Sequence, residues 1–474
     1  MPRSRLRFLL PLAMTLLACG PEGRTPTENP ANSPRARAFL DTLEQRTFAF
    51  FWERSDPATG LTPDRWPTPS FSSIAAVGFA LTAYPIGAER GWVTRAEAAN
   101  RVLTTLQWFW RAPQGPAPTG TSGYGGFFYH FLDMGTGLRY PGVELSTIDT
   151  ALLLAGALFC REYFGGSDPT EAGIRAYADS LYARVDWQWA AQRNPPLVAM
   201  GWRPEDGWSP LDWQGYNEAM LVYILGLGSP TSPLDAAAWN QWTATYRWGS
   251  FYGEDHIGFP PLFGHQYSHV WIDFRGIQDA YTRGRGLDYF ENSRRATRAQ
   301  RAYAIQNPGR WKGYGATLWG LTASDGPADV TLPVNGSPRR FFTYAARGAS
   351  FAEPPRDDGT IAPTAAAASL PFAPELVVPA LLHMRERYGE WLFGPYGFLD
   401  AFNPTFEFQV PLTHGRVVPG QGWFDTDYLG IDQGPIVAMI ANYKDDLIWK
   451  YMRQSPYVVR GLRRAGFTGG WLGP

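Results

Sequence analysis

Apolar helices that recur at a long, regular interval constrain this chain more than any other feature of its sequence. Stretches that are apolar on nearly every side, and rich in Ala and Gly, begin near Ser73, Thr147, Asn217 and Asp432. The first three follow one another at intervals of roughly 70 residues, which leaves room for a second helix and its loops in each interval. A helix that is apolar all round is typical of a buried position, whereas the intervening segments carry Arg and Glu on one face and predict exposed helices.

This repeat predicts an all-α fold in which a buried helix alternates with an exposed one. Such pairs close into an (α/α) toroid, here of roughly six pairs, and we expect one domain. Further buried helices are expected in 267–281 and 375–384, and strand signals are sparse. Helices are expected over these segments: 33–55, 72–87, 94–112, 145–164, 169–191, 216–228, 373–389 and 432–452.

The N-terminus has the pattern of an export signal. Three arginines precede an apolar run that is too short to span a bilayer, so residues 1–18 are expected to be a signal peptide. The run ends in "LLAC", which resembles the lipobox of bacterial lipoproteins and marks Cys19 for lipidation. Residues 19–34 are then a flexible tether and 35–474 the folded domain. We expect an exported lipoprotein, periplasmic or outer-membrane-anchored, that contacts the membrane by its lipid alone.

The composition limits the classes of ligand that the protein can bind. Aromatic residues make up 15% of the chain and include 20 Trp, which favours stacking surfaces, and the net charge of -1 gives no basic patch for nucleic acid. His265 and His269 are four apart but lack further ligands of a metal site, and no nucleotide-binding loop or nucleophile elbow occurs. Cys160 is expected to be a buried apolar residue. We expect a neutral ligand, no metal or organic cofactor, and a monomer.

Glu218 is the most informative polar residue. It heads the apolar run 216–228, and no Lys or Arg occurs between 212 and 228. Asn217 could cap this helix, in which case Glu218 complements the helix dipole. We favour a functional interpretation, because Trp213 and Tyr216 are residue types that stack on sugars and exclude water. An apolar setting also raises a carboxyl pKa toward the range of a general acid.

Other carboxylates occupy corresponding positions, just ahead of the buried helices, where a toroid of this kind has its open mouth. Glu144 could cap the helix that follows it or face the cavity, and Asp149, five residues later, points to another side and could bond loop amides. Asp400, in the loop "FLDAFNP", could form a turn or act at the site.

Six motifs, in order along the chain, carry a family resemblance: "TFAFFWERSDPATGLTPDR", "GGFFYHFLDMGTG", "ELSTIDTALLLAGAL", "GWSPLDWQGYNEAMLVYILGLGSP", "HQYSHVWIDFRG" and "GPYGFLDAFNP". From about residue 38 to 472 the chain resembles the bacterial glucoamylase-like domain family that includes the endo-β-1,2-glucanases of glycoside hydrolase family 144. The resemblance implies an (α/α)6 barrel, no cofactor, and inverting hydrolysis of β-1,2-linked glucose chains. It implies that Glu218, in the "YNEA" motif, is the general acid. Glu144 and Asp400 match other pocket carboxylates, and the choice between them as the group that handles water stays open.

Residues of two kinds complete the expected site. The candidates for sugar stacking are Trp52, Trp213, Tyr216 and Trp423. The candidates for binding hydroxyls are His130, Asp133, Asp149, Asn217, His269, Asp273, Arg275 and Gln433.

Two alternatives to this function are an enzyme acting on another glucan linkage and a non-catalytic glycan-binding lipoprotein. A lectin would not need a glutamate in the apolar setting of Glu218, which favours an enzyme.

Overall fold

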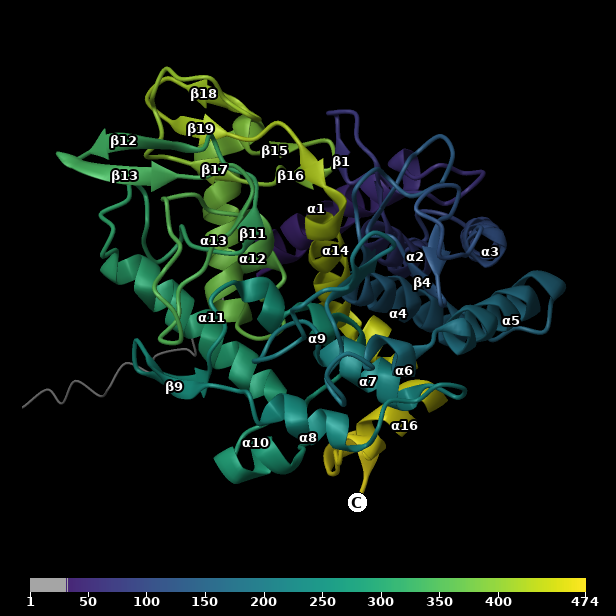
Figure 1. Cartoon of the computed structure of the whole chain (residues 1–474). Helices are drawn as coiled ribbons and strands as arrows, with labels where there is room; N and C mark the ends of the chain where they lie inside the picture. The colour runs from purple at the N-terminus through teal and green to yellow at the C-terminus, as the bar shows by residue number, and fades with distance from the viewer. Residues whose placement is uncertain (1–30, 32) are drawn as a thin grey trace, which may run out of the picture.

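The computed structural model describes residue 31 and residues 33–474, and its course is shown in Figure 1. The expected signal peptide, Cys19 and most of the expected tether lie outside the described residues. The helices are α1 (Pro34–Arg54), α2 (Ile74–Glu89), α3 (Arg95–Arg111), α4 (Thr147–Tyr163), α5 (Pro169–Arg184), α6 (Trp187–Ala190), α7 (Met220–Gly228), α8 (Ala237–Thr243), η2 (Leu262–His265), α9 (Tyr267–Trp271), α10 (Ala280–Arg285), α11 (Tyr289–Gln306), α12 (Pro363–Ala367), α13 (Pro374–Tyr388), η3 (Gly389–Trp391), α14 (Gly430–Asp445), α15 (Leu447–Met452), α16 (Pro456–Arg464) and η4 (Gly470–Leu472).

The strands are short and pair antiparallel in small sheets. They are β1 (Arg65–Trp66), β2 (Ser72–Ser73), β3 (Gly123–Tyr124), β4 (Phe127–Phe128), β5 (Phe131–Leu132), β6 (Leu145–Ser146), β7 (Gly201–Arg203), β8 (Gly207–Trp208), β9 (Trp248–Phe251), β10 (Glu254–Ile257), β11 (Ala323–Ser324), β12 (Val330–Val334), β13 (Ser337–Phe341), β14 (Ala345–Ala346), β15 (Phe393–Gly394), β16 (Gly397–Phe398), β17 (Phe402–Asn403), β18 (Arg416–Val418), β19 (Gly422–Phe424) and β20 (Tyr428–Leu429). Strand signals are sparse in the sequence because two-residue strands carry too little periodicity to be recognised.

The fold is rich in helix, and its apolar helices form the interior. Helices α2, α4, α7, α9, α12 and α14 are buried along most or all of their length. Helix α2 packs against both α4 and α14, α4 packs against α7, and α9 contacts α4, α7 and α14. Helices with charged faces lie outside them. Helix α1 packs against α2 and α14, α3 packs against α2, α5 packs against α4, and α16 packs against α7. The predicted alternation of buried and exposed helices is therefore confirmed.

Three details of the predicted helices are wrong. The segment 375–384 was expected to be buried, but it belongs to α13, which keeps exposed charged residues, and the short all-buried α12 contacts α14 instead. The segment 267–281 is not one helix: α9 ends at Trp271, and α10 begins only at Ala280. Helix α11 was not predicted, because its many Arg residues hide a half-buried face.

Cys160 is fully buried, as expected, and its thiol donates to the Leu81 carbonyl.

Within the part of the chain that the structure describes, no helix has the length and apolar character needed to cross a membrane.

Most of the labelled strands, including β1, β12, β13 and β15 to β19, lie at the upper end of the molecule in Figure 1. They bring together loops that are distant in sequence. Strand β1 pairs with β20, β6 with β7, β11 with β14, and β17 with β19. Strands β2, β6 and β20 directly precede the buried helices α2, α4 and α14.

The crossing of α2 and α4 depends on two glycines. A Cβ at Gly78 would lie 2.4 Å from the Leu152 carbonyl oxygen, and one at Gly156 would lie 2.1 Å from the Gly78 carbonyl oxygen. These are backbone atoms that cannot turn aside, so the two helices approach each other only because both positions lack a side chain.

We predict that Gly156→Ala lowers the free energy of unfolding by about 1–3 kcal/mol, because the added methyl group forces α2 and α4 apart. Gly165→Ala is the matched control, since nothing lies within 4 Å of a Cβ there. Denaturant unfolding of both variants measures the difference. Equal stability of the two variants would contradict the close approach.

Candidate active site

Glu218 lies in a turn immediately before α7, where the chain is fixed by side chains from the neighbouring helix α9. The Ser268 hydroxyl donates to the Glu218 carbonyl oxygen at 3.0 Å, and the Leu221 amide donates to the Ser268 hydroxyl at 3.1 Å. Helix α7 begins at Met220, so Asn217 is not its N-cap. The Asn217 carboxamide instead accepts from the Ala219 amide at 3.0 Å and holds the turn in which Glu218 sits.

Among the residues that the structure describes, no cation pairs with the Glu218 carboxyl. Its Oε2 atom has no hydrogen-bond partner among the described residues, although the side chain keeps some exposed surface. Burial raises the pKa of Glu218 to about 7, and the negative charge of Asp149 adds to the rise. A carboxyl in this environment holds a proton near neutral pH and can donate it, as a general acid must.

Glu144 lies in the opposite environment. His130 Nδ1 is 3.2 Å from one carboxylate oxygen, and the Arg203 guanidinium donates to the other at 3.0 Å. The bond to His130 lowers the pKa of Glu144 to about 2. Burial alone would lower the pKa of His130, but the charges of Asp149 and Glu144 outweigh it and raise that pKa to about 9. Glu144 is therefore a carboxylate, and His130 an imidazolium, at neutral pH.

Asp400 belongs to a group of buried aspartates. Its Oδ2 atom accepts from the Asp325 amide at 2.7 Å, and its Oδ1 atom has no hydrogen-bond partner within the described chain. Burial raises the pKa of Asp400 to about 7, helped by the charge of Asp325. Burial also raises the pKa of Asp425 and of Asp432 well above the usual range, and the neighbouring aspartates add to both shifts. The group holds more negative charge than its neighbours can neutralise.

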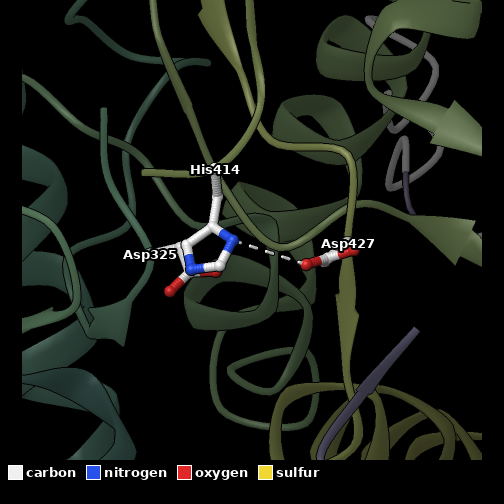
Figure 2. Close-up of side chains that lie close together, drawn as sticks. All are labelled: Asp325, His414 and Asp427. Carbon is white, nitrogen blue, oxygen red and sulfur yellow. Dashed lines mark ion pairs between the residues drawn. The ribbon is translucent and has the colours of Figure 1, made fainter. Parts of the chain in front are cut away.

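Arg65 supplies positive charge to one side of this group. Asp325, His414 and Asp427 lie close enough together to share a metal ion, as Figure 2 shows. The Arg65 guanidinium, however, donates to Asp325 Oδ2 at 2.7 Å and lies 3.2 Å from His414 Nε2 and 3.5 Å from Asp427 Oδ2. A guanidinium thus occupies the position that a cation would take among these three side chains.

Tyr267 and Asp64 connect the two halves of the site. Burial raises the pKa of Tyr267, and the charges of Asp432, Glu218 and Asp400 raise it further, so its hydroxyl lies within electrostatic reach of both halves. Asp64 interacts in the same way with His130 and with Asp325. Glu218 and Asp400 both act on Tyr267, and Asp64 links His130, the partner of Glu144, with Asp325, the partner of Asp400. The grouping of Glu218, Glu144 and Asp400 in one catalytic site stays a prediction.

A cavity of about 410 Å³ opens beside Glu144. Trp202 and Trp208, on the paired strands β7 and β8, line it together with Arg203 and Leu211. Sequence analysis missed these rings, although the hairpin "GWRPEDGW" places two Trp residues around a Gly turn. It also missed Asp64, Arg65, Tyr267, Asp325, Asp425, Asp427, Asp432 and His414.

The four residues expected to stack on sugars do not offer a free ring face, so that prediction is wrong. Trp213, Tyr216 and Trp423 are at most 5% exposed, and the indole nitrogens of the two tryptophans donate to Thr147 and His414. The Trp52 ring lies between Phe48, which stacks on it, and the Arg101 guanidinium, 4.5 Å from the ring centre.

Several residues expected to bind hydroxyls are also engaged elsewhere. His269 is fully buried, with Nε2 3.0 Å from the Ser293 hydroxyl, and burial lowers its pKa to about 3. Asp273 and Arg275 pair with each other beyond the C-terminal end of α9, in a cluster with Arg453 and Asp446. These three side chains are therefore engaged within the fold, and their assignment to the substrate stays a prediction.

The remaining candidates stay predictions. Asp133 uses one carboxylate oxygen to hold a turn by accepting from the Gly135 and Thr136 amides. Gln433 is buried beside Asp432, and its amide nitrogen donates to the Phe398 carbonyl at 2.8 Å. Asp149 bonds to Ser146 and faces His130 Nε2 at 3.5 Å.

Comparisons with known proteins show the family of this chain. The sequence profile of the family described as putative glucoamylase matches residues 210–456, slightly more than half of the chain. The chain therefore belongs to this family. A curated relative is the exo β-1,2-glucooligosaccharide sophorohydrolase (non-reducing end) of Parabacteroides distasonis, 30% identical over 461 residues. The match covers 90% of this chain and 57% of that protein, so the chain spans little more than half of the relative's length.

Solved structures share the fold. A putative glucoamylase of Bacteroides uniformis is 32% identical with a TM-score of 0.76, and the match covers 91% of this chain and 97% of that chain. An endo-β-1,2-glucanase of Chitinophaga pinensis, solved with sophorotriose and glucose, is 28% identical with a TM-score of 0.77. That match covers 92% of this chain and 99% of the glucanase.

We predict that His130→Gln loses stability against the wild type at pH 6 and that the difference shrinks as the pH rises to 10. His130 has a folded pKa of about 9, above its ordinary value, so its ion pairs stabilise the fold fully below an unfolded pKa of roughly 6.5 and are lost as the pH rises through about 9. Urea unfolding at several pH values measures this, with His383→Gln on α13 as the control. A difference that stays constant or grows with pH would contradict the imidazolium assignment.

Proposed function

We propose that the protein is a glycoside hydrolase that cleaves β-1,2-glucan or β-1,2-glucooligosaccharides with inversion, with Glu218 as the general acid. The observation that carries the proposal is the Glu218 carboxyl, which has no cation beside it in the described part of the chain and a pKa raised to about 7. The relatives' names support the substrate: one is a β-1,2-glucooligosaccharide sophorohydrolase and another an endo-β-1,2-glucanase. Incubation with a panel of linkage-defined glucans, followed by product sizing, tests the linkage and the cleavage pattern together.

In the proposed mechanism Glu218 donates its proton to the glycosidic oxygen as the bond to the sugar breaks. A second group takes a proton from the attacking water, directly or through a relay of water and a sugar hydroxyl. Of the two candidates for this group, we favour Asp400. An effective base needs appreciable proton affinity, and Glu144, with a pKa of about 2, has little. The neighbouring aspartates give Asp400 a much higher affinity.

Glu144 then serves as a fixed anion. Held by His130 and Arg203, it stays a carboxylate and can accept hydrogen bonds from sugar hydroxyls throughout the reaction. The adjacent cavity with Trp202 and Trp208 offers ring surface for a neighbouring glucosyl unit.

The finer architecture is part of the same proposal. We propose that the buried helices α2, α4, α7, α9, α12 and α14 and the helices outside them form an (α/α)6 toroid. The last buried helix, α14, packs against the first, α2, which supports the closure of the helices into a ring. We further propose a single catalytic domain over 35–474 that acts as a monomer and is exported as a lipoprotein, anchored through Cys19.

We predict that Glu218→Gln lowers kcat by roughly 10²-fold or more, because the amide keeps the shape but cannot donate the proton. Substrate binding and the unfolding temperature should change little. The wild-type activity should be highest near pH 7 and fall on both sides, because Glu218 loses its proton above that pH and Asp400, the proposed base, is protonated below it. Glu390→Gln, on an exposed side chain of η3, is the control. Near-normal turnover of Glu218→Gln would exclude it as the acid.

A second prediction concerns stereochemistry. Inversion at a β-linked glucosyl unit releases the new reducing end as the α-anomer. Proton NMR within the first minutes, before mutarotation, should therefore show the α-anomer accumulating first. Initial release of the β-anomer would instead indicate a covalent glycosyl-enzyme, with a carboxylate acting as nucleophile.

A further inference from the structure

Tyr344 combines an exposed ring with a position beside the buried aspartates. Its side chain is 53% exposed, which is unusual for a large aromatic residue, and it lies between the hairpin β12–β13 and strand β14. Scattered exposed aromatic residues need no explanation, but one beside a cluster of functional carboxylates does.

The strand pairing fixes the position of Tyr344. Strands β11 and β14 are antiparallel with Ser324 opposite Ala345, so the next position along the ladder places Tyr344 beside Asp325. The Asp325 amide donates to Asp400 Oδ2 at 2.7 Å. The backbone amide that bonds Asp400 therefore belongs to the residue opposite Tyr344.

Charge interactions connect Tyr344 with the site. Desolvation and the charges of Asp432 and Asp400 raise the pKa of Tyr344 well above its usual value, and Tyr344 also interacts with Tyr267. Tyr267 in turn lies within electrostatic reach of Glu218. Tyr344 therefore lies within electrostatic reach of Asp400 and Asp432, while much of the side chain remains open to solvent.

Arg347 holds the backbone on which Tyr344 stands. Its guanidinium donates to the Phe342 and Thr343 carbonyls at 3.0 and 3.1 Å, and to the Ser324 carbonyl at 2.8 Å. Arg347 is fully buried and pairs with Asp358 at 2.7 Å. These bonds tie both sides of the β11–β14 pair together, so the ring is presented in a fixed position rather than on a free loop.

We propose that Tyr344 is the stacking platform for the glucosyl unit held between Glu218 and Asp400, an inference that rests on the proposed function. A pyranose ring has an apolar face of C–H groups, and an aromatic ring fixed beside carboxylates that bind hydroxyls can cover that face. This assigns to Tyr344 the stacking role that Trp213 and Trp423, both buried, do not fill.

Three variants test the platform. Tyr344→Phe keeps the ring, Tyr344→Ala removes it, and Tyr252→Ala removes another exposed tyrosine, 39% exposed, from the turn between β9 and β10. All are assayed for kcat, KM and unfolding temperature on whichever glucan of the linkage panel the wild type cleaves. A wild type that cleaves another linkage would thus overturn the proposed substrate without obscuring the role of Tyr344.

We expect Tyr344→Ala to raise KM by roughly 3- to 10-fold, the range of a lost aromatic contact, with a smaller change in kcat and an unchanged unfolding temperature. Tyr344→Phe should stay within about twofold of the wild type, and Tyr252→Ala should match it. Wild-type KM in Tyr344→Ala would overturn the inference. So would an equal loss in Tyr344→Phe, because the hydroxyl and not the ring would then carry the effect.

Discussion

The burial of several carboxylates around few cations is the constraint on which the rest of the site depends. Asp325, Asp400, Asp425, Asp427 and Asp432 are each at most 3% exposed. Isolated charges in such surroundings are strongly unfavourable, so the fold must either neutralise these groups or hold them by hydrogen bonds.

Both solutions are present. Backbone amides each hold one oxygen of a side chain: the Asp325 amide bonds Asp400, the Thr426 amide bonds Asp425, and the Thr68 amide bonds Asp427. Arg65 neutralises one side of the group by pairing with Asp325. The charge that remains raises the pKa of Asp400, so the same crowding that is unfavourable for folding creates a group with the proton affinity of a base.

The sequence predicted the parts of the molecule that follow local rules. A helix that is apolar on all sides must be buried, and α2, α4, α7 and α14 are. Glu218 was found because its carboxylate stands in an apolar run without a neighbouring cation. The aspartate group was only partly found, because Asp325 and Asp427 come from loops that are joined by distant strand pairs such as β1 with β20. The stacking residues were wrong because Trp is equally suited to a core and to a sugar site, and only the tertiary fold decides which side of the ring is covered.

The two glutamates show how the fold assigns different chemistry to the same side chain. Glu218 and Glu144 both precede a buried helix, and Asp149 lies near each of them. His130 stands between Asp149 and Glu144, and its positive charge keeps Glu144 ionised. No such cation stands between Asp149 and Glu218 in the described chain, so the same aspartate favours the protonated form of Glu218. The His130 imidazolium and the Arg203 guanidinium beside Glu144, together with the burial of Glu218, therefore separate a carboxylate from a carboxylic acid.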